Sequence, residues 1–322
     1  MQNSYLKIFD NLFFDVEVHR DVKETVEQVS GVLDSIIIKF GEIENEMSMG
    51  ISRKDDFVDT VVILFIRKIM EQLDAINVLC SVCLFAPAQI ILRSLIENIV
   101  GLEFILKDNT QRRAAAYYLE HHYQEIDKGK IYFDAESEPA KQIIALEGKE
   151  EFDKICTKME KKEQALKRLI ASKVVFQEID KARKKKLDKK RKCQNKKYIQ
   201  WYEVCSDITS IYGLMKEVGY EKYYDGIYGG LSYESHGFNA TMGIGVDKDG
   251  IILKQIRMPE EGRNTFELAC NFAVGALHKI YQYLEDGESE IDEFREYFKA
   301  FVEKRNMAGD NLDKIRSVSD YM

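Results

Sequence analysis

The feature that most constrains the fold of this chain is the spacing of its apolar residues. In the first block, roughly Asp15 to Met47, they recur at intervals of three and four, which places them on one face of a helix. The apolar positions of this block include Val22, Val26, Val29, Leu33, Ile36 and Ile37. Only three prolines interrupt the chain, and Leu, Ile, Glu and Lys are abundant. The sequence therefore predicts a mainly α protein, a helical bundle.

Further helices follow from the same spacing and from turn residues. We expect them at roughly 55–85, 87–108, 110–129, 198–218, 264–286 and 289–306, with a turn at Ala86-Pro87. The Lys/Glu-rich stretch 137–197 has only a thin apolar stripe and predicts a helical-hairpin insertion. Apolar arms around Asp-Lys-Asp-Gly predict one small β-hairpin over 242–256. The domain organisation predicted is one helical domain, 1–322, that carries both features.

Localisation follows from what the sequence does not show. The N-terminus has neither a basic region nor a long apolar run of the kind found in secretory signals. The most apolar stretch, Val78 to Ile105, is interrupted by Pro87, Arg93 and Glu97 before about 20 residues accumulate. We therefore expect a soluble cytoplasmic protein with no membrane partner, whose six cysteines are reduced thiols.

Charge is distributed unevenly along the chain. The net charge is −8, but Lys181 to Lys197 contains eleven basic residues and one acid, Asp188. That segment carries +10, which leaves −18 for the rest of the chain. Such a run could bind a nucleic-acid backbone, and the candidates are Lys184, Lys185, Lys186, Lys189, Lys190, Arg191 and Lys192. The alternative is a solvated helical face paired with the upstream acids Glu160, Glu163 and Glu178.

An arginine and a glutamate lie one helical turn apart inside the apolar segment from Pro87 to Leu106. Their spacing of four puts Arg93 and Glu97 on the same helix face. We expect this pair to be at least partly buried, and burial of ions is costly unless they are well hydrogen-bonded. The pair therefore either fixes how the helices pack or forms part of a functional site.

His236 is the histidine best placed to join that pair. It follows Tyr228-Gly-Gly-Leu-Ser232-Tyr-Glu-Ser, and Gly237 would end the helix, so the dipole would favour the charged imidazole. With Arg93 and Glu97 it would form an acid–base set, and Ser232 or Tyr228 would position the substrate. In the structural alternative, His236 hydrogen-bonds Glu97 and joins two helices.

Two other motifs are weaker. His121 and Glu125 have a spacing that can hold a metal, but no further ligands are evident, so surface residues are favoured and no metal or cofactor is expected. Cys80 and Cys83 have the C-x-x-C spacing in an apolar run, which favours packed core thiols over a redox pair.

The motifs together resemble a known family. Arg93-Ser-Leu-Ile-Glu97 matches R-S-L-x-E, and Tyr228-Gly-Gly-Leu-Ser232-Tyr-Glu-Ser-His236 matches Y-x-x-L-S-x-x-x-H. Trp201 lies in the preceding helix, as the pattern requires. The chain resembles a bacterial family of helical proteins, the domain of unknown function numbered 5677, over roughly Asp55 to His278.

Proteins of that family are similar in their general helical architecture to HEPN domains. This resemblance implies a metal-independent ribonuclease in a toxin or antiphage system. HEPN enzymes usually carry R-x4-6-H on one helix, but here the corresponding positions are Leu231, Gly230 and Gly229. Arg93 would have to supply the charge from another helix.

Three function classes stay open at this point. One is a HEPN-like RNA-cleaving effector in which Arg93 holds the phosphate and His236 transfers the proton. The other is a non-catalytic helical module that binds a protein or ligand, with Arg93, Glu97 and His236 as a buried network. A metal hydrolase using His121 and Glu125 is a third. The partner classes considered are RNA, a protein encoded nearby and a second copy of the chain.

Overall fold

The structure is a computed structural model, and it describes residues 14–49, 57–134, 136–194, 198–234, 241, 243–247, 250–284 and 288–315. It is mainly helical, as the apolar spacing predicts. The chain divides into two compact units, each described separately below. Unit 1 combines Met1–Leu106 with Leu214–Met322, and unit 2 is Lys107–Gly213. The expectation of one domain with an insertion over 137–197 stays a prediction about domain organisation.

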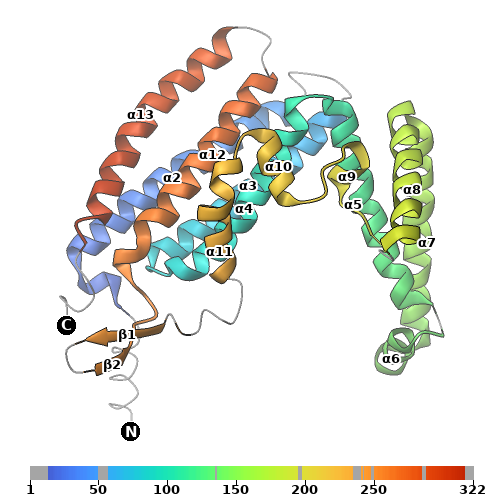
Figure 1. Ribbon diagram of the computed structural model, residues 1–322, viewed down its shortest axis with the longest axis horizontal. Helices are drawn as coiled ribbons and strands as arrows, with labels where there is room; N and C mark the ends of the chain where they lie inside the picture. The colour runs from blue at the N-terminus through green and yellow to red at the C-terminus, as the bar shows by residue number, and fades with distance from the viewer. Residues whose placement is uncertain are drawn as a thin grey trace. The chain divides into compact units, whose positions relative to one another are not determined.

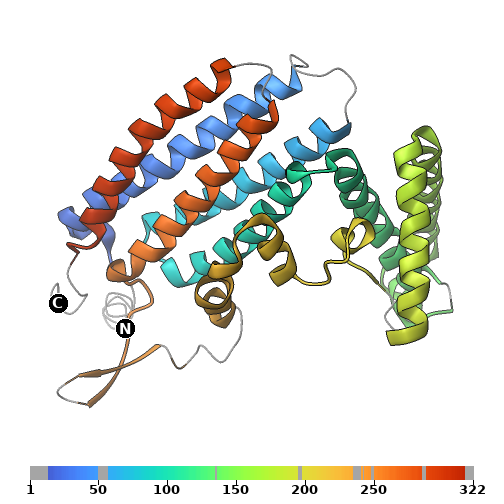
Figure 2. The same ribbon diagram turned by 45° about the horizontal axis from the view of Figure 1, so that its top comes forward.

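Unit 1 is built on long helices. They are α2 (Arg20–Ser48), α3 (Phe57–Ser81), α4 (Phe85–Lys107), α12 (Gly262–Leu284) and α13 (Glu288–Leu312), and a short 3-10 turn, η1 (Val16–Val18), precedes them. Helix α2 packs against α3 and α13, and α12 packs against α13 and α2. Figures 1 and 2 both show α2, α12 and α13 running side by side. The core lies between these helices.

The predicted apolar face of α2 is the buried one. Val22, Val29, Leu33 and Ile36 have no exposed surface, and Val26 is 4% exposed. The helix begins at Arg20 rather than near Asp15, because the Asp15 carboxylate accepts a hydrogen bond from the Glu17 amide and caps η1 instead.

The turn before the Arg93 helix lies earlier than expected. Helix α3 ends at Ser81 and α4 begins at Phe85, so the turn is at 82–84 and not at Ala86-Pro87. Cys83 takes a left-handed conformation there, with φ of 58°. Pro87 fits within the first turn of α4, where a backbone N–H has no intrahelical partner to lose.

Gly262 allows α12 to start against the Phe85 ring. A Cβ at this position would lie 2.5 Å from Phe85 Cζ, closer than real carbon atoms approach each other. The helix expected from residue 264 therefore begins two residues earlier, at Gly262. It follows η5 (Pro259–Glu261) directly.

The helix expected over 198–218 is two helices. Helix α9 (Trp201–Cys205) stops where the Ser206 hydroxyl donates to the Tyr202 carbonyl and accepts from the Ile208 amide. Helix α10 (Ile211–Val218) follows and ends at Gly219, whose φ is 92°. The next stretch, residues 220–234, is rich in tyrosine, and we call it the aromatic segment. It forms η2 (Glu221–Tyr223), a π-helical turn η3 (Tyr224–Tyr228) and α11 (Gly229–Glu234).

Unit 2 contains α5 (Thr110–Phe133), α6 (Glu138–Glu147), α7 (Lys149–Ser172), α8 (Val174–Gln194) and α9. Helix α5 packs against α7, α8 and α9, and α7 packs against α8. The Ser137 hydroxyl accepts from the Ala140 amide and caps α6. The thin apolar stripe predicted for α7 is used in this packing, since Phe152 and Leu166 are buried.

Two four-residue strands, β1 (Ile244–Asp247) and β2 (Gly250–Leu253), pair antiparallel with Ile244 opposite Leu253. They lie inside the stretch 242–256, whose Met242 and turn residues 248–249 are outside the described residues. The ribbon is too small to change the mainly α class. None of the described helices combines the length and apolar character that crossing a membrane requires.

Candidate functional site

Arg93 on α4 is held by residues of the aromatic segment. Its Nη1 donates to Ser232 Oγ at 2.9 Å and its Nη2 donates to Tyr228 Oη at 3.0 Å. The Tyr228 hydroxyl in turn donates to Glu97 Oε1 at 2.5 Å, and Arg93 Nε lies 3.4 Å from the same carboxylate oxygen. The guanidinium carbon also lies 4.7 Å from the centre of the Tyr228 ring. Four of the five predicted site residues of unit 1 therefore form one network.

This network is open to solvent. The Arg93 side chain is 25% exposed and the Glu97 side chain is 43% exposed, so the pair is partly buried, as expected, but both charges reach solvent. The helix is apolar on the faces that meet the core, but Ile90, one turn before Arg93, is itself 45% exposed. Arg93 and Glu97 thus lie at the edge of the apolar face.

Arg93 stays charged and Tyr228 stays neutral at neutral pH. Desolvation lowers the pKa of Arg93, but its hydrogen bond to Tyr228 and the nearby Glu97 charge outweigh this effect, so the net direction is upward. Burial and the bond to Glu97 raise the pKa of Tyr228 to about 12, so its phenol stays protonated. The site presents a permanent cation beside a proton donor.

A second contact fixes the aromatic segment along α4. Tyr220 donates to Glu103 Oε1 at 2.8 Å, ten residues after Arg93 on the same helix. Glu103 is only 4% exposed, and burial raises its pKa to about 7. Since Tyr220 meets Glu103 while Ser232 meets Arg93, the segment runs antiparallel to α4. Sequence inspection missed Glu103, because a lone glutamate in an apolar helix gives no sign of its distant partner.

His236, the fifth predicted residue, lies outside the described residues. Glu234, the last residue of α11, is its nearest described neighbour within the motif. Its role as general acid or base stays a prediction.

A family model described as "Family of unknown function (DUF5677)" matches residues 59–251, more than half of the chain. The chain belongs to the DUF5677 family. No curated protein and no solved structure matches it.

The DUF5677 region contains both motifs that suggested the family. The structure joins them, because Arg93 and Glu97 of the first motif bond Tyr228 and Ser232 of the second. Residues about 135 positions apart in the sequence thus meet at one place on the surface of unit 1.

An almost completely buried ion pair of this DUF5677 protein lies in unit 2. Arg183 Nε and Nη2 donate to the two oxygens of Glu120 at 2.6 and 3.2 Å, and the two side chains are 7% and 2% exposed. Arg183 also lies 3.8 Å from the Tyr123 ring centre, and Tyr123 donates a short hydrogen bond to Asp180. Sequence inspection did not single out this pair, because Glu120 and Arg183 lie 63 residues apart.

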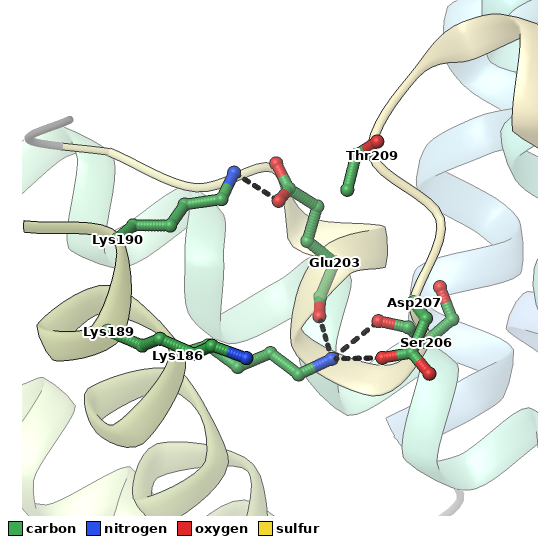
Figure 3. Close-up of a pocket in the computed structure, with 7 residues that line it drawn as sticks. All are labelled: Lys186, Lys189, Lys190, Glu203, Ser206, Asp207 and Thr209. Atoms are coloured by element: carbon green, nitrogen blue, oxygen red, sulfur yellow. Dashed lines mark hydrogen bonds and ion pairs between the residues drawn. The ribbon is translucent and has the colours of Figure 1, made fainter. Parts of the chain in front are cut away.

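The predicted nucleic-acid residues lie on α8 and have different surroundings. Lys186 Nζ donates to the Glu203 and Ser206 carbonyls at 2.7 and 2.5 Å and thereby caps the C-terminus of α9. Lys190 pairs with the Glu203 carboxylate. Figure 3 shows both ammonium groups directed at α9 and the loop after it, across a pocket of about 220 Å³. Lys184 pairs with Asp180 at 2.7 Å.

Lys185, Lys189, Arg191 and Lys192 are exposed, and within the described part of α8 none of them forms an ion pair. The predicted set is thus divided between residues that hold the fold and residues directed to solvent.

The two weaker motifs have ordinary surroundings. Glu125 pairs with Lys162 at 3.2 Å, and the described residues contain no group of three or more acidic, His or Cys side chains placed for a metal. Cys80 and Cys83 are each 1% exposed, and burial raises the pKa of both thiols to about 12. Packed thiols of this kind are not reactive at neutral pH.

Proposed function

We propose that this protein is a HEPN-like effector of a bacterial toxin or antiphage defence system, and that it cleaves RNA without a metal at a site built on Arg93. The observation that carries the proposal is the way in which Arg93 is held. Its two Nη atoms donate to neutral hydroxyls, those of Ser232 and Tyr228, and a quarter of the side chain faces solvent. Its positive charge is positioned but only partly neutralised.

The same chain contains an arginine held for structure alone, and the contrast supports the proposal. Arg183 donates to both oxygens of Glu120, and both side chains are almost completely buried. Arg93 has its carboxylate at 3.4 Å, on Nε only, and both charges reach solvent. An ion pair that only stabilises the fold can be fully buried, whereas an arginine that binds a phosphate must be accessible to solvent.

The chemistry needs a cation, a proton acceptor and a proton donor. RNA supplies its own nucleophile, because the 2′-oxygen loses a proton, bonds the adjacent phosphorus and displaces the 5′-oxygen, which takes up a proton. The products are a 2′,3′-cyclic phosphate and a 5′-hydroxyl. Arg93 would stabilise the charge that develops on the phosphoryl oxygens. His236 would transfer one of the protons, and Glu97 would hold Tyr228 and Arg93 in place.

Purified protein incubated with total RNA in the presence of a chelator tests this proposal. We expect fragments ending in cyclic phosphate, and a loss of about 100-fold or more in rate for Arg93→Ala and for His236→Ala. Arg263→Ala is the matched control, since Arg263 and Glu267 are also four apart on a helix, with 29% and 30% exposure. Cleavage that persists in both site variants would sink the proposal.

A second candidate is a non-catalytic module that binds a protein partner or a ligand. It is favoured by one observation, namely that both Nη atoms of Arg93 already have partners within the chain. On this view Arg93 fixes the aromatic segment to α4. Absence of RNA cleavage, together with an Arg93→Ala variant that unfolds more easily, would support it over the ribonuclease.

A further inference from the structure

Four basic residues of α8 form a solvent-facing row. Lys181, Lys185, Lys189 and Lys192 follow one another at spacings of four, four and three, which keeps them on one side of a helix. All four are exposed. The opposite side of α8 is buried through Phe176, Ile179, Arg183 and Leu187. We call these four residues the lysine row.

Two of the three acids expected to neutralise this row, Glu163 and Glu178, have other partners. Glu163 pairs with Lys167 at 3.3 Å and with Lys130 at 3.7 Å, and Glu178 pairs with Arg112 at 3.2 Å. Asp188 lies on the same face, but within the described part of α8 no ion pair joins it to a lysine of the row. On that face of α8 the acidic residues are Asp188 and Glu178, and Glu178 already pairs with Arg112, so the four cations of the row outnumber the acids beside them.

Two other lysines of α8, Lys186 and Lys190, have a structural role. Lys186 and Lys190 reach the carbonyls and carboxylate of α9, and Figure 3 shows Lys189 beside them with no dashed contact. Lys189 lines the same pocket but donates to none of these groups. The row is thus not required to hold α8 against its neighbours.

We propose that the lysine row binds the phosphate backbone of single-stranded RNA. At about 1.5 Å of rise per residue, neighbouring charges lie roughly 5–6 Å apart along a row of about 16 Å, a spacing similar to that of phosphates on an extended strand. Tyr198, which follows α8, is 64% exposed and offers a ring on which a base can stack. The row should bind RNA of any base sequence, because a lysine ammonium is a point charge without the planar set of donors that arginine presents.

This inference rests on the proposed function for the identity of the polymer, but its test does not depend on cleavage. Binding of a labelled mixed-sequence RNA 20-mer by the full chain is measured by fluorescence anisotropy between 50 and 200 mM salt. For four phosphate contacts, log affinity should fall with log salt with a slope of about −3. The test variant combines Lys181→Gln, Lys185→Gln, Lys189→Gln and Lys192→Gln.

We expect the test variant to lose roughly tenfold or more in affinity at 50 mM salt, and to lose most of the slope. The control removes four exposed basic residues of α7 in the same unit, none of which forms an ion pair among the described residues. It combines Lys149→Gln, Lys158→Gln, Lys161→Gln and Arg168→Gln. Circular dichroism checks that both variants keep their helices.

The outcomes separate this inference from the proposed function. If the unaltered protein binds RNA through the lysine row but does not cleave it, the ribonuclease proposal alone is overturned. Tyr198→Ala should weaken binding of single-stranded RNA and leave duplex RNA unaffected. Equal loss in the test and control variants, or equally tight binding of polyglutamate or of anionic vesicles, would overturn the lysine row as an RNA site.

Discussion

Individual residues of the same type have different roles in this chain, and burial separates them. Arg93 and Arg183 both lie near glutamates, but only Arg183 makes a bidentate pair sealed from solvent. A buried charge left without its partner is far more costly than an exposed one, because water cannot replace the lost contact.

The stability of single-site variants should follow this difference. Arg183→Ala should lower the free energy of unfolding by about 3–5 kcal/mol, because it leaves Glu120 buried and unpaired. Arg93→Ala should cost about 1–2 kcal/mol, since its bonds are to hydroxyls near solvent. Urea titration of the two variants measures both values. A larger loss for Arg93→Ala would show that Arg93 is the main structural clasp.

Tyr228 joins the two charges of the candidate site through one oxygen. Tyr228→Phe removes that oxygen and keeps the ring over the guanidinium, so Arg93 and Glu97 lose their shared partner. We expect a loss of roughly tenfold or more in RNA cleavage, with about 1–3 kcal/mol of stability lost. Cleavage assays and urea titration on the same preparation separate the two effects. An unchanged cleavage rate would remove Tyr228 from the site.

At the scale of elements, α4 and the aromatic segment are tied at both ends. Tyr220 bonds Glu103, and Tyr228 and Ser232 bond Arg93. The Glu103 end depends on protonation, because burial raises the pKa of this carboxyl to about 7.

Protonation of Glu103 should make the stability of the protein depend on pH. Its pKa is raised on folding, so the native state holds the proton more tightly than the unfolded state. The contribution of Glu103 to the free energy of unfolding is therefore fully present below about pH 4.5 and is lost as the pH rises to about 7. This contribution is on the order of 2–3 kcal/mol.

Glu103→Gln should remove this component, so that the difference from the unaltered protein grows between pH 5 and 8. Tyr220→Phe should shift the loss to higher pH, because the Tyr220 hydrogen bond lowers the pKa of Glu103. Thermal melts across this pH range measure both changes. Parallel pH profiles for all three proteins would contradict this account of Glu103.

At the scale of the whole molecule, two compact units share one chain, and unit 2 is a continuous segment. Trp201, the single tryptophan, lies in unit 2 and packs edge-on against Tyr117, with ring centres 5.3 Å apart. Tryptophan fluorescence therefore reports on unit 2, while circular dichroism reports on both units.

We expect the two signals to give different unfolding midpoints in urea, because each unit has its own core. Arg183→Ala should lower the urea midpoint seen by fluorescence, and it should leave unchanged the part of the dichroism transition that comes from unit 1. Val29→Ala on α2 should do the reverse, since this side chain is fully buried in unit 1. Coincident transitions in every variant would mean that the units unfold as one.

The sequence by itself determined what depends on local spacing. The α2 face, the helical character of 137–194 and the pairing of Arg93 with Glu97 all follow from a period of about 3.6 residues. The two family motifs were also visible in the linear sequence. Local errors arose where a side chain redirected the backbone, as Ser206 does when it ends α9.

Only the tertiary structure decided which distant groups meet and how far they are buried. No local rule links Arg93 to Tyr228 or Arg183 to Glu120, which lie 135 and 63 residues apart. Exposure is likewise a property of packing, so it took the fold to show that Arg93 reaches solvent while Arg183 does not. The difference between a pair that can meet a ligand and a pair that holds helices together is made by the surrounding elements, because they determine how much water reaches each charge.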